Sequence, residues 1–245
     1  MLLRRLTAHV RDQNWLAIAL DLLVVVVGLF IGLQIDTWWE GQKEAQFESV
    51  YLMEIQEDFE ANRSSLEEQI RVTEQTISDM ITLHAQALLP EPSLSFSELN
   101  TRFISIHNMP SFVLVTRAYD NLTGSGDLKL LGSRPLKNAL AEYYAAAELA
   151  AVVQATHEME LVQTFQPYII DNLDYAAVRP TKWLTYDLVN DFPLTASSNE
   201  ARILDVLDTR QFRNVVVQKW VIGTDLLDQF RGMLERTNEV LAMLE

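Results

Sequence analysis

The sequence contains no cysteine, and this absence excludes several kinds of chemistry at once. Without a thiol there can be no disulfide, no cysteine nucleophile and no thiolate metal site. Glycine and proline are also scarce, with 8 Gly and 7 Pro in 245 residues. A turn-rich all-β protein needs more of both residues than this, so the composition favours a mainly helical fold.

Basic residues are few as well: 19 Lys and Arg stand against 34 Asp and Glu, which gives a formal net charge of −15. Three arginines and Asp12 lie within residues 1–14, so this short arm carries +2 and the remainder of the chain carries −17. An acidic body repels the phosphates of nucleic acids. We therefore expect no nucleic-acid partner.

One long apolar run is present, WLAIALDLLVVVVGLFIGLQI, from Trp15 to Ile35. At about 1.5 Å per residue a helix over this run spans roughly 31 Å, close to the ~30 Å hydrocarbon core of a bilayer. Indole rings favour the headgroup region at each end of such a helix, which suits Trp15, Trp38 and Trp39 as membrane-interface anchors. The run therefore predicts a single transmembrane helix over residues 15–39, with the lipid bilayer as its partner.

Charges differ between the two ends of this run. The residues that set the topology are the basic ones before it, Arg4, Arg5 and Arg11. Acidic residues, Asp36 and Glu40, follow it. Because positive segments stay in the cytoplasm, the pattern predicts a cytoplasmic basic arm over residues 1–14 and an acidic helical extracytoplasmic domain over residues 40–245.

Two other interpretations of the run remain open. A cleavable signal peptide has an apolar core of about 7–15 residues that leads to a small-x-small cleavage site. Here the run is longer, and the following LQIDTWWE contains no such site. A buried helix of a soluble protein is the third interpretation, and the four consecutive valines with flanking tryptophans argue against it.

The predicted transmembrane helix has one face that could meet a second helix. Gly28 and Gly32 form a GxxxG motif, which permits close approach of two helices. Asp21 and Asp36 fall on nearly the same face at about 100° per residue. One interpretation is an interface with a second copy or with another membrane protein, in which Asp21 is hydrogen-bonded. The other is that Asp21 lies at the headgroups and that the glycines have no partner.

The remainder of the chain shows mostly helical periodicity. The acidic residues of the first long helix, Asp58 among them, are expected mostly on its solvated side. Between the helices, residues 112–122 fit either helix or strand, Gly124–Gly126 predicts a turn, and residues 167–197 read as an irregular connection with at most one helical turn. The helices are expected from the membrane to about Leu89, from Ser97 to His107, from an N-cap at Ser133 to about Thr164, around Ile203–Leu207 after a cap at Ser198 or Asn199, and from Phe212 to Leu244. The predicted fold is mainly α, with an N-terminal single transmembrane helix that continues into an extracytoplasmic helical bundle.

The sequence contains no complete motif for catalysis or for binding a cofactor. His157-Glu158 begins like the zinc motif HExxH, but the second histidine is replaced by Leu161. The Glu-x-x-His pairs of di-iron helical proteins are absent. Clustered carboxylates at 57, 58, 60, 67 and 68 could hold a divalent cation, although acidic helix faces are usually just solvated. The sequence therefore predicts no catalytic, cofactor-binding or metal-binding residue, no cofactor, and no enzymatic activity.

The segment VVVVGLFIGLQIDTWWE, followed by YLMEIQEDFEANRSSLEEQI, resembles an uncharacterised bacterial family of single-pass membrane proteins classed as a domain of unknown function. That family shares a VVVGxFIGLQIxxWxE-like transmembrane motif. The likeness extends through AYDNLTGSGDLKLLGSRPLKNALAEYY and ILDVLDTRQFRNVVV, with Trp38-Trp39-Glu40 where the family usually has Trp-Asn-Glu. The resemblance implies bacterial origin and an inner-membrane location, and it implies no activity.

These observations favour a membrane-anchored non-enzymatic scaffold, or an accessory subunit of an inner-membrane assembly, that associates with itself or with another membrane protein through the transmembrane helix. Its N-terminus is expected in the cytoplasm and its C-terminal domain in the periplasm. An extracytoplasmic ligand-sensing helical domain that signals through a partner is the alternative, since the arm of about 14 residues is too short for an output domain. A periplasmic enzyme with a dispersed active site is the third hypothesis.

Overall fold

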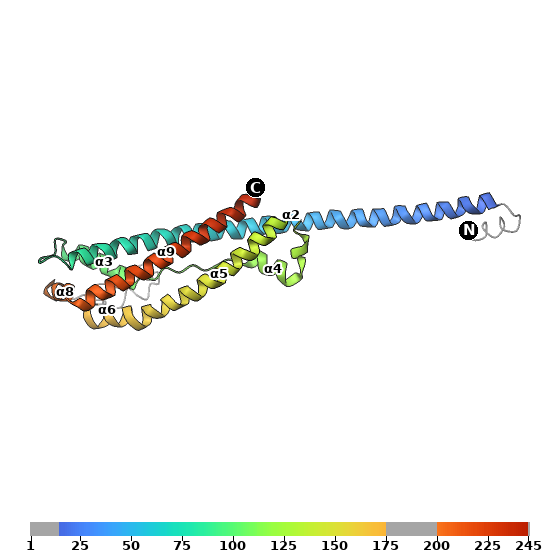
Figure 1. Cartoon of the computed structure of the whole chain (residues 1–245). Coiled ribbons are helices and arrows are strands. Elements are labelled where there is room, and N and C mark those ends of the chain that lie inside the picture. Colours follow the sequence, from blue (N-terminus) through green and yellow to red (C-terminus); the bar gives the residue numbers. More distant parts are fainter. Residues whose placement is uncertain (1–14, 175–199, 245) are drawn as a thin grey trace, which may run out of the picture. The chain divides into compact units, whose positions relative to one another are not determined.

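The structure is a computed structural model that describes residues 15–174 and 200–244. Within these ranges the chain is mainly helical and contains no strand (Figure 1). It divides into two compact units, one formed by residues 1–54 with 121–132 and the other by residues 55–120 with 133–245. The three topology-setting arginines of the arm, Arg4, Arg5 and Arg11, lie outside the described residues, as do the predicted caps Ser198 and Asn199.

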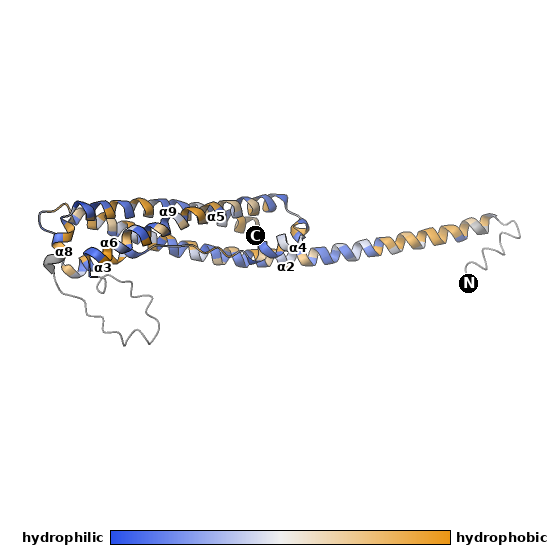
Figure 2. Cartoon of the chain, turned by 90° about the horizontal axis from the view of Figure 1, so that it is seen from below, coloured by the Kyte–Doolittle hydropathy of each residue, from blue (hydrophilic) through white to orange (hydrophobic). Residues whose placement is uncertain are grey.

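Helix α2 (Trp15–Gln86) is a single helix of 72 residues. Figure 2 shows its hydropathy changing along its length, from continuously hydrophobic at the N-terminal end to mixed beyond it. The helix ends three residues before the predicted Leu89, because the Gln86 side chain accepts hydrogen bonds from the backbone N–H groups of Ser93 (2.8 Å) and Leu94 (3.2 Å). These bonds fold the chain back around the turn that contains Pro90.

The first unit contains the N-terminal part of α2, the end of helix α4 (Arg117–Ser125) and the 3-10 helix η1 (Asp127–Leu130). Two side-chain contacts hold the second segment on α2: the Tyr51 hydroxyl donates to Asp127 (2.8 Å), and the backbone N–H of Gly132 donates to Glu48 (2.6 Å). The predicted turn at Gly124–Gly126 is only partly correct, because α4 continues through Ser125. Gly126, with a φ of 76°, makes the reversal that glycine tolerates best.

The second unit is built from the C-terminal part of α2 and the helices that follow it. They are α3 (Phe96–His107), α5 (Arg134–Glu160), the π-helix η2 (Leu161–Phe165), α6 (Gln166–Asn172), α8 (Glu200–Leu207) and α9 (Arg210–Leu244). The start of α3 is a capping box in which Ser95 and Glu98 each accept a backbone N–H. The predicted N-cap of α5 is confirmed, since Ser133 accepts from the backbone N–H of Leu136.

The core of the second unit lies where α5 packs along α9 and where both meet α2. Phe59 of α2 is fully buried against Tyr143 of α5, with ring centroids 4.6 Å apart. Phe103 of α3 meets Phe212 of α9 edge to face at 5.6 Å. Buried aromatic pairs of this kind contribute roughly 0.5–1.5 kcal/mol each beyond their area.

The expected irregular connection after Pro167 is wrong at its start, because α6 continues helical to Asn172. Pro167 lies in the first turn of α6, where a missing backbone N–H costs no hydrogen bond. The predicted end of the long helix at Thr164 falls within η2, so α5, η2 and α6 follow one another without a gap. The rest of the predicted connection, residues 175–197, lies outside the described residues.

Candidate functional site

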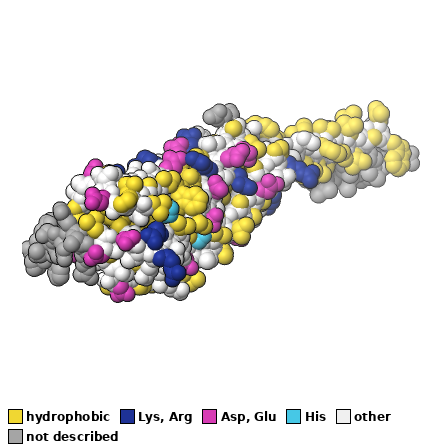
Figure 3. Space-filling view, turned by 60° about the vertical axis from the view of Figure 1, so that its left-hand side comes forward, with side chains coloured by type: hydrophobic (Ala, Val, Ile, Leu, Met, Phe, Trp, Pro, Cys, Tyr) yellow, Lys and Arg dark blue, Asp and Glu magenta, His cyan; other side chains and the backbone are white. Residues whose placement is uncertain are grey.

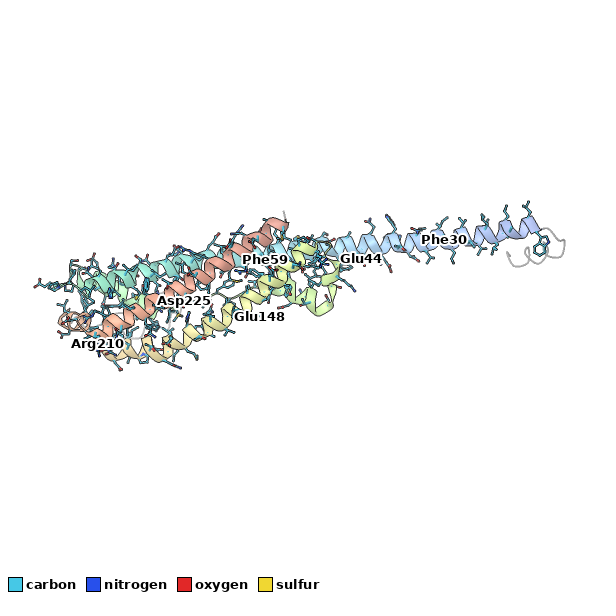
Figure 4. The ribbon with its side chains drawn as sticks, viewed as in Figure 1. Phe30, Glu44, Phe59, Glu148, Arg210 and Asp225 are labelled. Carbon is cyan, nitrogen blue, oxygen red and sulfur yellow. The ribbon has the colours of Figure 1, made fainter. Side chains whose placement is uncertain are left out.

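The apolar part of α2 is the clearest functional feature of the first unit. Among the described residues, α2 alone is long and apolar enough to cross a membrane, and the most apolar part of it is not buried by any other part of the chain. Its side chains project outward, as Figure 4 shows for Phe30, and hydrophobic atoms cover its surface in Figure 3. The three predicted anchors are exposed, at 75% for Trp15, 61% for Trp38 and 56% for Trp39.

The residues of the predicted helix interface all lie on this helix. A Cβ atom added to Gly28 or Gly32 would meet no atom within 4 Å. Asp21 is half-buried, and its Oδ2 atom accepts no hydrogen bond from the described residues. Asp36 is exposed. The stripe is therefore open at Gly28, Gly32 and Asp36, where no described residue of this chain covers it.

The second unit contains a feature that the sequence did not reveal: residues 108–116 run between α3 and α4 without regular structure, yet they are mostly shielded from solvent. A shielded backbone without helix or strand needs hydrogen-bond partners from side chains. Three side chains supply them, and a fourth bonds the first turn of α4 directly after the segment. Lys219 donates to the Asn108 carbonyl, Gln154 accepts from the Phe112 N–H, and Asn62 bonds both backbone groups of Val115. Asp58 accepts from the Ala118 N–H.

Asp58 and Asn62 lie one turn apart on α2 and act on the end of this segment. Asn62 is fully buried; its amide donates to the Val115 carbonyl (3.0 Å) and accepts from the Val115 N–H (2.8 Å). Asp58, 1% exposed, accepts from the Ala118 N–H (2.8 Å) and from the Arg117 guanidinium (2.8 Å). Asp58 thereby acts as the N-cap of α4 from a different helix.

Lys219 of α9 is the most unusual of the four side chains. It is 1% exposed, its ammonium group donates to the Asn108 carbonyl, and its Nζ atom lies 4.8 Å from the centroid of the Phe165 ring. Burial lowers the pKa of Lys219 to about 7. Burial, together with the positive charge of Lys219, also lowers the pKa of His107.

A signal for these residues was present in the sequence. Lys219 occupies a position on the apolar face of α9, at a helical spacing from Val216 and Ile222. Asp58 was assigned to the solvated side of α2, and this assignment is wrong: it lies between Ile55 and Phe59 on the buried face. Lys219 and Asp58 each occupy a position where the helical spacing of an apolar stripe would place an apolar residue. This pattern indicates a buried polar side chain.

Two hollows formed by described residues of the second unit are small and mostly apolar. One cleft of about 200 Å³ lies between residues 112–114, α5 and α9. Its polar lining residues are Glu148, Gln154 and Gln229. A second hollow of about 250 Å³ lies between α2 and α9 beside Trp220 and His84. Among the described residues, no three His, Asp or Glu side chains gather in a way that could hold a metal ion.

No family model matches this chain, and neither a curated protein nor a solved structure does so. The resemblance to a bacterial membrane-protein family therefore stays a prediction.

Proposed function

We propose that this protein is a membrane-anchored, non-enzymatic scaffold or accessory subunit of a bacterial inner-membrane assembly. The observation that carries the proposal is the apolar stretch of α2, whose exposed side chains have no partner among the described residues. Such a surface is unstable in water, and a bilayer with tryptophans at its two interfaces would cover it. The acidic helical bundle would then lie in the periplasm, and residues 1–14 would lie in the cytoplasm.

The small size of the concavities supports a scaffold over an enzyme. Ligand sites usually occupy about 300–1,000 Å³ and combine an apolar lining with several convergent polar groups. The two hollows of the second unit are smaller than this and are lined mainly by aliphatic and aromatic side chains. Its buried polar groups, such as Asp58 and Asn62, are occupied with the backbone of residues 108–118.

We further propose that α2 pairs with a second membrane helix through the face of Asp21, Gly28, Gly32 and Asp36. Small residues allow two backbones to approach closely in lipid, where packing drives association. Asp21 would gain a hydrogen-bond partner there, which offsets the cost of placing a carboxyl group inside the membrane.

The test is the mass of the detergent-solubilised protein, purified from its native membrane, with co-purifying proteins identified. A defined oligomer or a stoichiometric partner is expected, and Gly28→Leu with Gly32→Leu should abolish it. Leucine fits at both positions of the single chain, so a loss reports on association. The matched control is Val26→Leu with Phe30→Leu on the opposite face of the helix. A clean monomer without partners, or an oligomer unchanged by the glycine substitutions, contradicts the interface.

The cleft at Glu148 and Gln154 favours one alternative, a ligand-sensing domain that signals through a partner. Glu148 and Gln229 could orient a small ligand against the Phe112 and Phe230 rings. A screen of small molecules by thermal unfolding of the purified chain tests this function. Stabilisation that disappears in a Gln229→Leu variant would favour the sensor.

A further inference from the structure

Helix α5 has an apolar face that its own fold leaves uncovered. Leu149, Val152 and Met159 are 67%, 65% and 55% exposed. Their spacings of three and seven residues place them on one side of the helix, with the exposed Ala145 one turn before Leu149 and the exposed Thr156 between Val152 and Met159. This set of five residues is called the α5 outer face below.

The side chains of the α5 outer face are not part of the core. The residues of α5 that pack inward are on the other side of the helix, among them Tyr143 at 1% and Ala147 at 7% exposed. Ala147 and Gln154 of that inner side line a cleft together with Phe230 and Met233 of α9. Single exposed apolar residues are ordinary, but a stripe with the spacing of a helix seam is the pattern by which one helix meets another.

The charged residues of α5 that lie beside the outer face are negative. At about 100° per residue Glu142 and Glu148 flank it on its two sides, and Figure 4 marks Glu148 on α5. From residue 138 to residue 178 the sequence contains no Lys or Arg. Glu142 and Glu148 form no ion pair with any described residue, so their charges remain available to a partner.

We propose that the α5 outer face binds a basic amphipathic helix of a partner protein, with its apolar side against Leu149, Val152 and Met159 and its Lys or Arg residues against the flanking glutamates. Complementary charge selects among the possible occupants. A second copy would bring the same acidic rims together, and an anionic lipid surface would be repelled. The inference rests on the proposed scaffold function and identifies the chemistry of its partner.

The experiment uses the full chain in nanodiscs of uncharged phosphatidylcholine, so that a basic peptide has no lipid charge to bind. The probe is a fluorescein-labelled model helix with leucines at three- and four-residue spacing flanked by lysines. Its control peptide has the same composition in an order that breaks the spacing. Fluorescence anisotropy should show saturable binding of the first peptide and at least tenfold weaker binding of the second.

Two pairs of substitutions then locate the site. Leu149→Gln with Val152→Gln, and separately Glu142→Gln with Glu148→Gln, should each weaken binding about tenfold. The glutamate pair should also flatten the dependence of affinity on salt. The control is Val217→Gln with Val221→Gln on α9, where both side chains are 44% exposed. All six positions are on the surface, and circular dichroism checks that each variant folds.

Equal binding of the two peptides, or wild-type affinity in both α5 variants, would overturn the proposal. A pairing of two copies that depends on Leu149 and Val152 would also overturn it and would make the occupant a second chain. Incorporation into nanodiscs is measured first by gel filtration. A chain that does not enter the disc contradicts the proposed membrane function, whereas a chain that enters but does not bind the peptide contradicts the α5 proposal alone.

Discussion

Lys219 carries an ammonium group into a part of the core where its neighbours on α9 are Val216 and Ile222. The Asn108 carbonyl and the Phe165 ring are its partners. Neither is a charged group, and burial of a cation without an opposite charge is costly. Lys219 therefore fixes the start of residues 108–116, but its burial destabilises the fold. The size of this destabilisation depends on whether the amine is protonated.

The sign of that dependence follows from the two pKa values. Lys219 titrates at about 7 in the fold, against an ordinary value of 10.5. Between pH 7 and 10.5 the unfolded chain therefore binds more protons at this residue, and the folded state gains stability as the pH rises. We expect the free energy of unfolding, relative to that of Lys219→Met, to increase by up to about 1.4 kcal/mol per pH unit in this window.

Denaturant titrations at pH 6.5, 8 and 9.5 in detergent, followed by circular dichroism, measure this difference. Other titrating groups cancel because they are common to both proteins. Lys129→Met serves as the control, since Lys129 is exposed on η1. A Lys219→Met difference that does not change with pH would show that the amine has its ordinary pKa in the fold.

Asp58 provides a second prediction at the scale of one residue. Asp58→Ala leaves the buried Ala118 N–H without an acceptor and removes the cap of α4, and the expected loss of stability is about 1–3 kcal/mol. Arg117→Gln removes only the exposed partner, whose side chain is 74% accessible, and should cost less than about 1 kcal/mol. Thermal unfolding of the two variants compares them. Equal losses would mean that the ion pair, and not the cap, stabilises this joint.

Apolar periodicity predicted the core face of α2 only in part, and it did not predict which polar residues enter the core. Ile55, Phe59 and Leu66 lie buried as the helical spacing indicates, whereas Ile81 and Leu88, which share that spacing, are 57% and 63% exposed. Asp58 and Asn62 are buried with them because residues 108–118 cross the same face, and that crossing is a long-range contact. The local sequence shows that Asp58 is in register with the apolar stripe, but it contains no record of the distant backbone that its carboxylate contacts.

At the scale of the element, the π-helix η2 accounts for the way α5 passes into α6. A π turn closes its hydrogen bonds over five residues, so it contains one residue more than an α turn. The Gln166 N–H, for example, donates to the Leu161 carbonyl. Within η2, Phe165 is fully buried under Lys219, whereas Val162 is 63% exposed.

Deletion of Val162 should therefore convert η2 into an ordinary α turn and keep the helices before and after it in register. Deletion of Ala155, an exposed residue within α5, should instead rotate everything after it by about 100° and expose the core residues. We expect the first variant to unfold cooperatively near the wild-type temperature and the second to lose its cooperative transition. A scan of circular dichroism against temperature distinguishes them.

The helices themselves were largely predictable, because their caps and periods are local. Ser133 begins α5 and His107 ends α3 where the sequence indicated. The α6 helix was not predicted, because Pro167 was taken as a helix breaker although it lies in a first turn. The π turn has no local signature, since its extra residue is accommodated by packing around Phe165.

At the scale of the whole molecule, the absence of cysteine makes the topology directly measurable. A single introduced cysteine is the chain's only thiol. Glu91→Cys, at an exposed position after α2, should react with a membrane-impermeant maleimide in intact cells. Thr7→Cys in the N-terminal arm should react only after the inner membrane is permeabilised. Labelling is read from a gel shift.

The reverse labelling pattern would place the C-terminal domain in the cytoplasm and contradict the proposed topology. If neither cysteine reacted before permeabilisation, the C-terminal domain would not be extracytoplasmic, and this result would also contradict the proposed topology. Wild-type protein, which has no thiol, is the control for unspecific reaction.

The lack of lysine along most of α5 determines which cross-linking reagents can detect a protein bound to this helix. The sequence has no lysine between Lys137 and Lys182, so amine-reactive cross-linkers have no attachment point on this surface. Trypsin likewise leaves residues 138–178 within one large fragment. Cross-linkers that couple carboxylates to hydrazides would instead use Glu142 and Glu148, and cleavage after the uncoupled acidic residues would divide this region into shorter fragments. A mass-spectrometric map made with lysine chemistry alone would report α5 as free of contacts even if a partner covered it.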